Sequence, residues 1–169
     1  MPRNIEVKAR IAGVAALEPL VAALADQGPV KILQDDTFFR CEGGRLKLRA
    51  LGDATAELIF YRRGNQPGPK ESFYVRSPVA APDALREVLS LAYGVVGRVR
   101  KQRTVYLVGR TRVHLDTVEG LGEFLEFEVV LTDDEEPQDG VREAQRLMNR
   151  LAIRPADLVE GAYVDLPTR

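Results

Sequence analysis

The sequence predicts an α+β fold, in which a closed eight-stranded antiparallel β-barrel, or tunnel, carries helices packed outside it. About eight segments alternate apolar and polar residues with the period of a β-strand, and short turns join most of them. Stretches with one apolar stripe at helical spacing lie between some of these segments. Short turns favour an antiparallel meander, and eight strands is a common number for a small barrel. An open sheet with its charged face in water is the alternative.

The first expected strand, residues 4–11, shows the alternation clearly. Its apolar positions are Ile5, Val7, Ala9 and Ile11, and its polar positions are Asn4, Glu6, Lys8 and Arg10. Gly43-Gly44 is typical of a tight hairpin between the second and third strands. The remaining strands are expected at 30–42, 45–51, 56–63, 70–76, 96–109, 110–118 and 122–132.

The last expected strand contains two closely spaced carboxylates. Alternation places Phe124, Glu126 and Glu128 on one face, with the two acids roughly 7 Å apart along the strand. This face is either the solvated outer surface of a half-buried strand or a carboxylate pair held for a divalent cation.

Helices are expected at 14–27, 83–93, 138–152 and, shorter, at 156–160. Gly28-Pro29 is expected to stop the first of them. A single apolar stripe needs an apolar partner, which the apolar faces of the strands supply. If the helices cover the outside of a barrel, the charged faces must line its inside.

Composition restricts the possible functions. With 169 residues, one domain covering 1–169 is expected. One cysteine, Cys41, and one histidine, His114, leave carboxylates as the plausible metal ligands, which favours Mg²⁺ or Mn²⁺. The sequence has no signal peptide and no membrane-spanning apolar run, so we expect a cytoplasmic protein without a membrane partner. The 24 basic and 25 acidic residues give near-neutral charge, which disfavours a nucleic-acid binder.

The proposed inward face carries charges of both signs. Its cations are Lys8, Lys47, Arg49, Arg63, Lys101, Arg103 and Arg112, and its acids are Glu6, Glu57, Asp116, Glu126 and Glu128. So many cations in one lumen repel one another unless a polyanion lies among them. Arginine and lysine suit phosphate oxygens, while the acids suit divalent ions that bridge to the phosphates. The set therefore favours a metal-bound triphosphate as ligand.

These residues occur in motifs that resemble a known family. Asn4-x-Glu6-x-Lys8 resembles the E-x-E-x-K signature of the CYTH superfamily, the triphosphate tunnel metalloenzymes. Further similar motifs follow in the family's order: Gln34-Asp-Asp-Thr-Phe-Phe39, Leu46-Lys-Leu-Arg49, Glu57-Leu-Ile-x-Tyr61, Lys101-x-Arg103, His114-Leu-Asp116-x-Val118 and Gly122-x-Phe124-x-Glu126-x-Glu128. The resemblance extends to Tyr163-Val-Asp-Leu166, and segments 4–10 and 114–128 look most similar to the class IV adenylyl cyclase branch.

The resemblance implies an eight-stranded tunnel that depends on Mg²⁺ or Mn²⁺. It implies that Glu6, Glu126 and Glu128 bind metal, and that Asp116 is an acid at the metal and substrate. The phosphate-binding cations that it implies are Lys8, Lys47, Arg49, Lys101, Arg103 and, beside the adjacent Arg62, Arg63; the inward set adds Arg112. The expected catalytic residues are Glu6, Lys8, Asp116, Glu126 and Glu128. Asn4 departs from the motif, because a glutamate would stand there, and it brings no charge to a second metal site.

Several residues have a structural interpretation beside the functional one. Glu57 is either a metal ligand or a salt-bridge partner of a tunnel lysine. His114 is expected to point inward and to make a structural hydrogen bond. Tyr61 and Phe124 either line the tunnel or stack on a base.

Three functions follow from this sequence. The first is a class IV adenylyl cyclase-like enzyme that converts ATP to cyclic AMP and pyrophosphate. The second is an organic or inorganic triphosphatase, thiamine triphosphatase-like, that releases phosphate. The third is a non-catalytic polyphosphate-binding module, which the missing charge at Asn4 favours. A monomer or a homodimer is expected.

Overall fold

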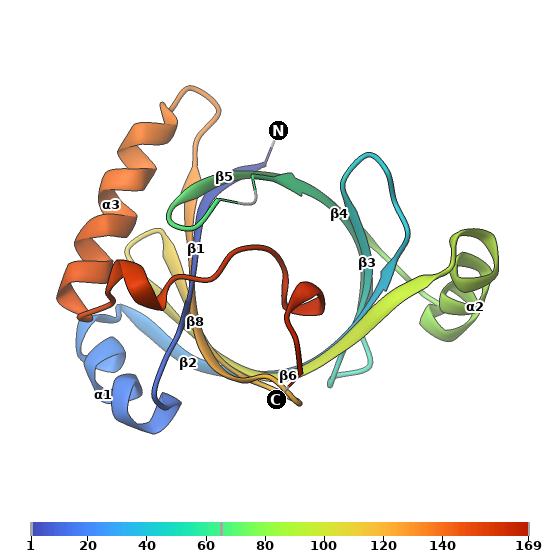
Figure 1. Ribbon diagram of the computed structural model, residues 1–169, viewed down its shortest axis with the longest axis horizontal. Helices are drawn as coiled ribbons and strands as arrows, with labels where there is room; N and C mark the ends of the chain where they lie inside the picture. Colours follow the sequence, from blue (N-terminus) through green and yellow to red (C-terminus); the bar gives the residue numbers. More distant parts are fainter. Residues whose placement is uncertain (1, 65, 169) are drawn as a thin grey trace.

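Eight antiparallel strands close into a barrel in the computed structural model, which describes residues 2–64 and 66–168 (Figure 1). Their order around the barrel is β1-β5-β4-β3-β2-β6-β7-β8. The strands are β1 (Arg3–Arg10), β2 (Gln27–Phe39), β3 (Arg45–Leu51), β4 (Ala56–Arg63), β5 (Lys70–Pro78), β6 (Val95–Val108), β7 (Thr111–Val118) and β8 (Gly122–Leu131). This closure confirms the predicted fold and rules out the open sheet. Residues 1, 65 and 169 of the predicted domain lie outside the described residues.

The register of the strands brings distant charged positions together. Glu6 and Lys8 of β1 lie opposite Glu128 and Glu126 of β8. Arg103 of β6 lies opposite Asp116 of β7 in the same way. Because successive side chains point to opposite faces of a strand, the polar positions share the lumen while the apolar ones face outward.

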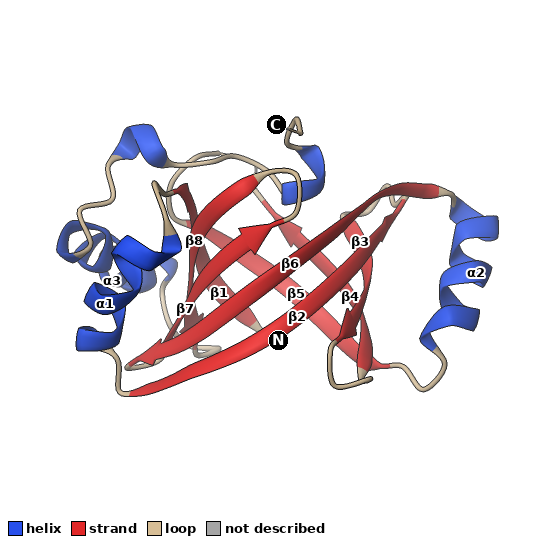
Figure 2. Cartoon of the chain, turned by 90° about the horizontal axis from the view of Figure 1, so that it is seen from below, coloured by secondary structure: helices blue, strands red, loops and turns tan. Residues whose placement is uncertain are grey.

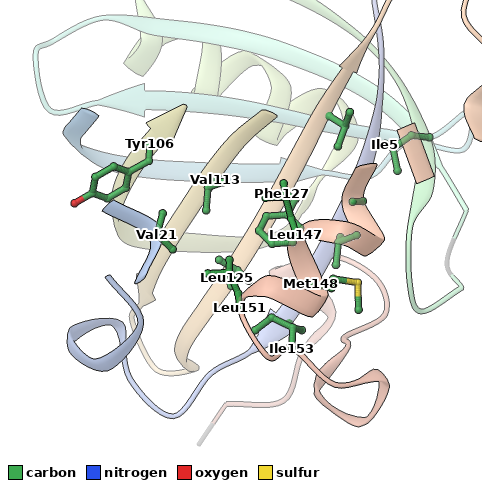
Figure 3. Close-up of a cluster of buried hydrophobic side chains, with 14 of the residues drawn as sticks. Ile5, Val21, Tyr106, Val113, Leu125, Phe127, Leu147, Met148, Leu151 and Ile153 are labelled. Atoms are coloured by element: carbon green, nitrogen blue, oxygen red, sulfur yellow. The ribbon is translucent and has the colours of Figure 1, made fainter. Parts of the chain in front are cut away.

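The outward apolar face is covered by helices on one side of the barrel. Helices α1 (Val14–Leu24) and α3 (Pro137–Arg150) lie against the wall made by β1, β6, β7 and β8 (Figure 2). Their apolar stripes pack on Val113 and Phe127 in the main hydrophobic cluster, which Figure 3 shows. Both of these residues are fully buried. The wall that carries the acidic strand β8 is therefore the most tightly supported part of the barrel.

Helix α2 (Pro82–Tyr93) lies at the opposite side of the barrel, against β2 and β3 (Figure 1). None of its residues is buried. This helix is therefore attached to the barrel without contributing to either hydrophobic cluster.

Three elements differ from the prediction by about three residues at an end: the first helix, the last short helix and the second strand, which runs from Gln27 to Phe39 and not over 30–42. The first helix ends at Leu24, and Gly28-Pro29 belongs to β2, because Asp26 and Gln27 already pair with Leu107 of β6. Tertiary strand pairing here overrides a helical sequence pattern.

The helix expected at 156–160 is a 3₁₀ turn at Pro155–Asp157. Directly after it the chain is extended, since Leu158 bridges Ala9 and the Val159 amide donates to the Lys8 carbonyl. Pairing with the edge of β1 thus prevents a longer helix.

Candidate functional site

The lumen contains a charged cavity of about 320 Å³, a size typical of a small-molecule site. All but one of the predicted site residues line it: Glu6, Lys8, Lys47, Arg49, Arg63, Lys101, Arg103, Arg112, Glu126 and Glu128. They come from six strands, β1, β3, β4, β6, β7 and β8. The alternation along each strand brings them to one place.

Asp116 is the exception, because it lies in the wall behind the cavity-lining side chains. Its two carboxylate oxygens accept hydrogen bonds from Arg103 at 2.8 and 2.7 Å, and Tyr163 Oη donates to Oδ2 at 2.8 Å. Burial alone would raise the pKa of Asp116, but the charges of Arg103 and Lys101 outweigh it and hold the pKa far below its usual value. In the structure Asp116 is an ionised group that orients Arg103.

Asp36 holds Arg49 in the same way, although it was not among the predicted site residues. Its oxygens accept from Arg49 Nε at 2.9 Å and from Nη2 at 2.8 Å. Two guanidinium groups are thus fixed beside the lumen by bidentate pairs. Side chains alternate along β2, so Asp36 lies on the same face as Gln34 and Phe38. This alternation could have identified Asp36 as a lumen residue from the sequence.

Three lysines in the lumen have no carboxylate to themselves among the described residues. Lys47 Nζ and Lys101 Nζ lie 3.5 and 3.8 Å from the nearest carboxylate oxygens, which arginines already hold. Lys8 Nζ donates to the Gly161 carbonyl at 3.1 Å and forms no ion pair with any described residue. Burial lowers the pKa of Lys8 and Lys47 to about 7 and that of Lys101 to about 8. The lumen therefore has cationic groups that an anion would stabilise.

The predicted metal-binding carboxylates lie together on neighbouring strands, but they are not equivalent. Glu6 Oε2 is paired with Arg63 Nη1 at 2.5 Å. Burial raises the pKa of Glu6, Arg63 offsets part of the rise, and Glu126 adds to it. Burial would also raise the pKa of Glu126, but the positive charge of Arg103 and then of Lys8 holds it well below its usual value. Glu126 is thus an ionised carboxylate beside an acid that an arginine already neutralises.

A histidine joins Glu126 and Glu128. One ligand atom from each of Glu126, Glu128 and His114 lies within 4.8 Å of the others. His114 Nδ1 is buried, has no hydrogen-bond partner among the described residues, and lies 3.9 Å from Glu128 Oε1. The structural hydrogen bond expected for His114 is therefore missing at this atom. Two ionised carboxylates and an unpartnered nitrogen fit a divalent cation.

A profile of the CYTH domain matches residues 2–163, nearly the whole chain. The chain belongs to the CYTH domain family. This confirms the resemblance drawn from the motifs.

Individual relatives agree with the family assignment. The chain is 28% identical to adenylate cyclase CyaB of Aeromonas hydrophila, over 95% of this chain and 86% of the relative. The fold is similar to that of the PH1012 protein of Pyrococcus horikoshii OT3, with a TM-score of 0.86 and 23% identity over 96% and 98% of the two chains. It is also similar to HpAC1 of Hippeastrum, described with a dominant triphosphatase activity, with a TM-score of 0.65 and 20% identity over 94% and 91%.

The C-terminal turn, residues 161–166, closes one end of this CYTH tunnel, and the sequence analysis gave it no role (Figure 2). The Gly161 carbonyl accepts from Lys8 and, at 2.7 Å, from Arg63. The Tyr163 ring lies 4.0 Å from Lys8 Nζ and 4.7 Å from Lys101 Nζ. A 3₁₀ turn of three residues is too short to show a periodic pattern in the sequence. The family resemblance, which extends to Leu166, was the one signal in the sequence that pointed to this turn.

The positions of Glu57, Tyr61 and Phe124 in the barrel decide in part between the roles expected for them. Glu57 lines the cavity 4.0 Å from Arg76, which supports the salt-bridge interpretation with a partner other than a lysine. Tyr61 lines the cavity, whereas Phe124 is fully buried under Tyr163, with ring centroids 4.9 Å apart. Phe124 is thus a packing residue in this structure.

No helix in the described ranges 2–64 and 66–168 has the length and apolar character needed to cross a membrane.

Proposed function

We propose that this CYTH protein is a divalent-metal-dependent enzyme that acts on a triphosphate in its lumen, with conversion of ATP to cyclic AMP and pyrophosphate as the leading reaction. The observation that carries the proposal is the set of buried lysines Lys8, Lys47 and Lys101, which share their nearest carboxylates with arginines or form no ion pair with the described residues, in the cavity that also holds Glu126 and Glu128. A polyphosphate supplies the negative charge that these lysines lack.

The arginines are arranged to bind phosphate oxygens without reorganising. Asp116 and Asp36 hold the guanidinium groups of Arg103 and Arg49 by bidentate pairs. Because both groups are held before the ligand arrives, their remaining N–H donors stabilise charge that develops in the transition state at little further entropic cost.

In the cyclase reaction, the ribose 3′-oxygen forms a bond to the α-phosphorus as the bond from that phosphorus to the β-phosphate oxygen breaks. The hydroxyl proton passes to solvent, and pyrophosphate leaves with its charge stabilised by the lysines and arginines. Glu126 and Glu128 would hold Mg²⁺ or Mn²⁺, with Glu6 beside them in its pair with Arg63. A bound divalent ion lowers the pKa of a hydroxyl group that it contacts and neutralises phosphate charge.

The organic part of the substrate has an apolar end of the lumen available to it. Along β2, β3 and β6, the apolar residues Ile32, Leu51 and Val105 line the cavity on the side of the charged positions away from the C-terminal turn. We place the nucleoside there, with the phosphates toward the turn.

The choice of cyclase as the leading reaction comes from similarity to adenylate cyclase CyaB over 95% of the chain. A triphosphatase is the second candidate, because the similar structure of HpAC1 is described with a dominant triphosphatase activity. In that reaction water forms a bond to the γ-phosphorus as the bond from that phosphorus to the β-phosphate oxygen breaks, so the diphosphate part departs, orthophosphate is released as the other product, and the water proton passes to solvent.

Product analysis separates these functions. The protein is incubated with ATP or with tripolyphosphate, in Mg²⁺ or Mn²⁺, and the products are resolved by ion-exchange chromatography. Cyclic AMP with pyrophosphate supports the cyclase, and orthophosphate supports the triphosphatase. Glu126→Gln should abolish either activity while keeping metal-free ATP binding, whereas Glu87→Gln, on the exposed face of α2, should change neither. Binding without turnover in both metals would contradict the enzyme proposal and favour the binding module.

A further inference from the structure

Unpartnered polar atoms gather around the lumen. Within the described residues, four buried side-chain atoms lack a hydrogen-bond partner: Asn4 Oδ1, Gln34 Oε1, Ser72 Oγ and His114 Nδ1. All four residues line the same cavity. An unsatisfied buried polar atom destabilises the fold, so a cluster of them points to groups kept for a ligand.

His114 is the one of these residues that lies in the acidic cluster. Its backbone is opposite Glu126 in the β7–β8 pairing, and its side chain is only 4% exposed. Glu128 uses Oε2 to accept from Arg112, at 2.9 Å from Nε and 2.8 Å from Nη2. The other oxygen, Oε1, is the one 3.9 Å from His114 Nδ1, too far for a hydrogen bond. Glu128 Oε1 and His114 Nδ1 thus lie near each other without a hydrogen bond between them.

The geometry leaves His114 Nδ1 available to a metal ion. This atom is buried and makes no hydrogen bond with the described residues. A neutral imidazole has one nitrogen with a free lone pair.

We propose that His114 Nδ1 completes a three-ligand metal site with Glu126 and Glu128, and that this mixed nitrogen and oxygen site favours a first-row transition ion such as Mn²⁺ over Mg²⁺. The physical reason is that Mg²⁺ prefers oxygen ligands and keeps its water, while an imidazole nitrogen binds transition ions better. Glu6 then remains the partner of Arg63 and is not a primary ligand. The inference rests on the proposed function only in placing the metal where substrate phosphates would meet it.

The test uses the full chain without an affinity tag, stripped of metal and then loaded with Mn²⁺ in the absence of nucleotide. The chain has one histidine, so any imidazole nitrogen that couples to the Mn²⁺ electron spin must belong to His114. Pulsed electron paramagnetic resonance should show this ¹⁴N coupling in the wild type and lose it in His114→Asp. Competition between Mn²⁺ and Mg²⁺ should show that the same change, which makes every ligand an oxygen, lowers the Mn²⁺ preference by about tenfold.

Controls keep the result interpretable. Thermal unfolding checks that His114→Asp folds, and Glu128→Gln should weaken Mn²⁺ binding although its histidine is intact. Bound Mn²⁺ without ¹⁴N coupling, an unchanged metal preference in His114→Asp, or no Mn²⁺ binding at all would overturn the inference. The proposed function fails separately, if the nitrogen-coupled metal is present and ATP and tripolyphosphate are not turned over.

Discussion

Among the single residues of the lumen, Tyr163 contributes a neutral group between charged ones. Its hydroxyl donates to Asp116, and burial raises the pKa of the phenol well above its usual value, so it stays a donor at every physiological pH. The Tyr163 ring also packs edge-on against Phe124, with an interplanar angle of 64°. The hydroxyl and the ring therefore have separable roles.

We expect Tyr163→Phe to lower the free energy of unfolding by about 1.5–3 kcal/mol, the worth of a hydrogen bond to a charged group. The ring contacts with Lys8 and Phe124 should survive. Urea unfolding followed by circular dichroism measures the change. Tyr93→Phe is the matched control, because Tyr93 is 56% exposed and its hydroxyl makes no hydrogen bond with the described residues. Equal stability of the two variants would show that the hydroxyl is not important.

Lys47 illustrates a conflict between binding and stability. Burial first, and then the charge of Arg49, lower its pKa to about 7, which Asp36 offsets only in part. The unfolded state, with a lysine pKa of about 10.4, binds more protons between about pH 7 and pH 10. The contribution of Lys47 to the free energy of unfolding should therefore rise with pH across that window. At pH 7, burying this lysine lowers the free energy of unfolding.

Lys47→Met should raise the free energy of unfolding by about 1 kcal/mol at pH 7 and weaken metal-free ATP binding. Thermal unfolding and calorimetry measure the two effects. Lys31→Met, at an exposed position of β2, should leave both unchanged. A less stable Lys47→Met would mean that the pair with Asp36 outweighs the burial of the charge.

At the scale of elements, the C-terminal turn rests on β6 through a glycine. A Cβ atom added at Gly97 would lie 2.5 Å from Val164 Cγ2, closer than two carbon atoms can approach. The turn therefore lies against β6 because this position has no side chain. The same turn supplies the Gly161 carbonyl that Lys8 and Arg63 share.

Gly97→Ala should displace the C-terminal turn at a cost of about 1–3 kcal/mol, as overpacking does elsewhere. Hydrogen exchange measured by mass spectrometry should become faster in residues 161–166 and stay unchanged in β8. Gly43→Ala is the matched control, since a Cβ there meets nothing within 4 Å. Unchanged exchange in the turn would show that Val164 adjusts instead.

At the scale of the whole molecule, the barrel gathers basic side chains around its lumen although the net charge of the chain is close to zero. The chain carries a formal net charge of −1, yet Lys8, Lys47 and Lys101 surround one cavity with pKa values lowered by burial to about 7, 7 and 8. They are protonated below these values and lose charge as pH rises through them. Terminal phosphates keep their charge above about pH 6.

Metal-free ATP binding should therefore weaken by at least about tenfold between pH 7 and pH 8.5, because the lysines and not the ligand change charge. Isothermal titration calorimetry with a chelator at constant ionic strength measures the affinity. Lys47→Met should show a shallower fall. A flat profile in the wild type would contradict the lowered lysine pKa values.

The residues that face the lumen were predictable because side chains alternate strictly along a strand. Glu6, Lys8, Glu126 and Glu128 were assigned to one face of each strand, and the structure brings all four to one cavity. The apolar positions between them indicated that this face would be inside, since the helices needed the other one. Strand periodicity is local, so the sequence alone predicted the strands and most of the cavity lining, whereas the structure decided between the closed barrel and the open sheet.

The tertiary structure alone decided which of these charges are paired and which are available. Tyr163 covers Asp116 across 47 residues, and Gly161 meets Lys8 across 153. His114 lies opposite Glu126 in the β7–β8 register, and Arg112 engages Glu128 Oε2 while Oε1 lies 3.9 Å from His114 Nδ1. Such contacts depend on the three-dimensional approach of distant segments, which no periodicity encodes. The pattern of strands thus set where charge collects, and the packed barrel set what that charge can bind.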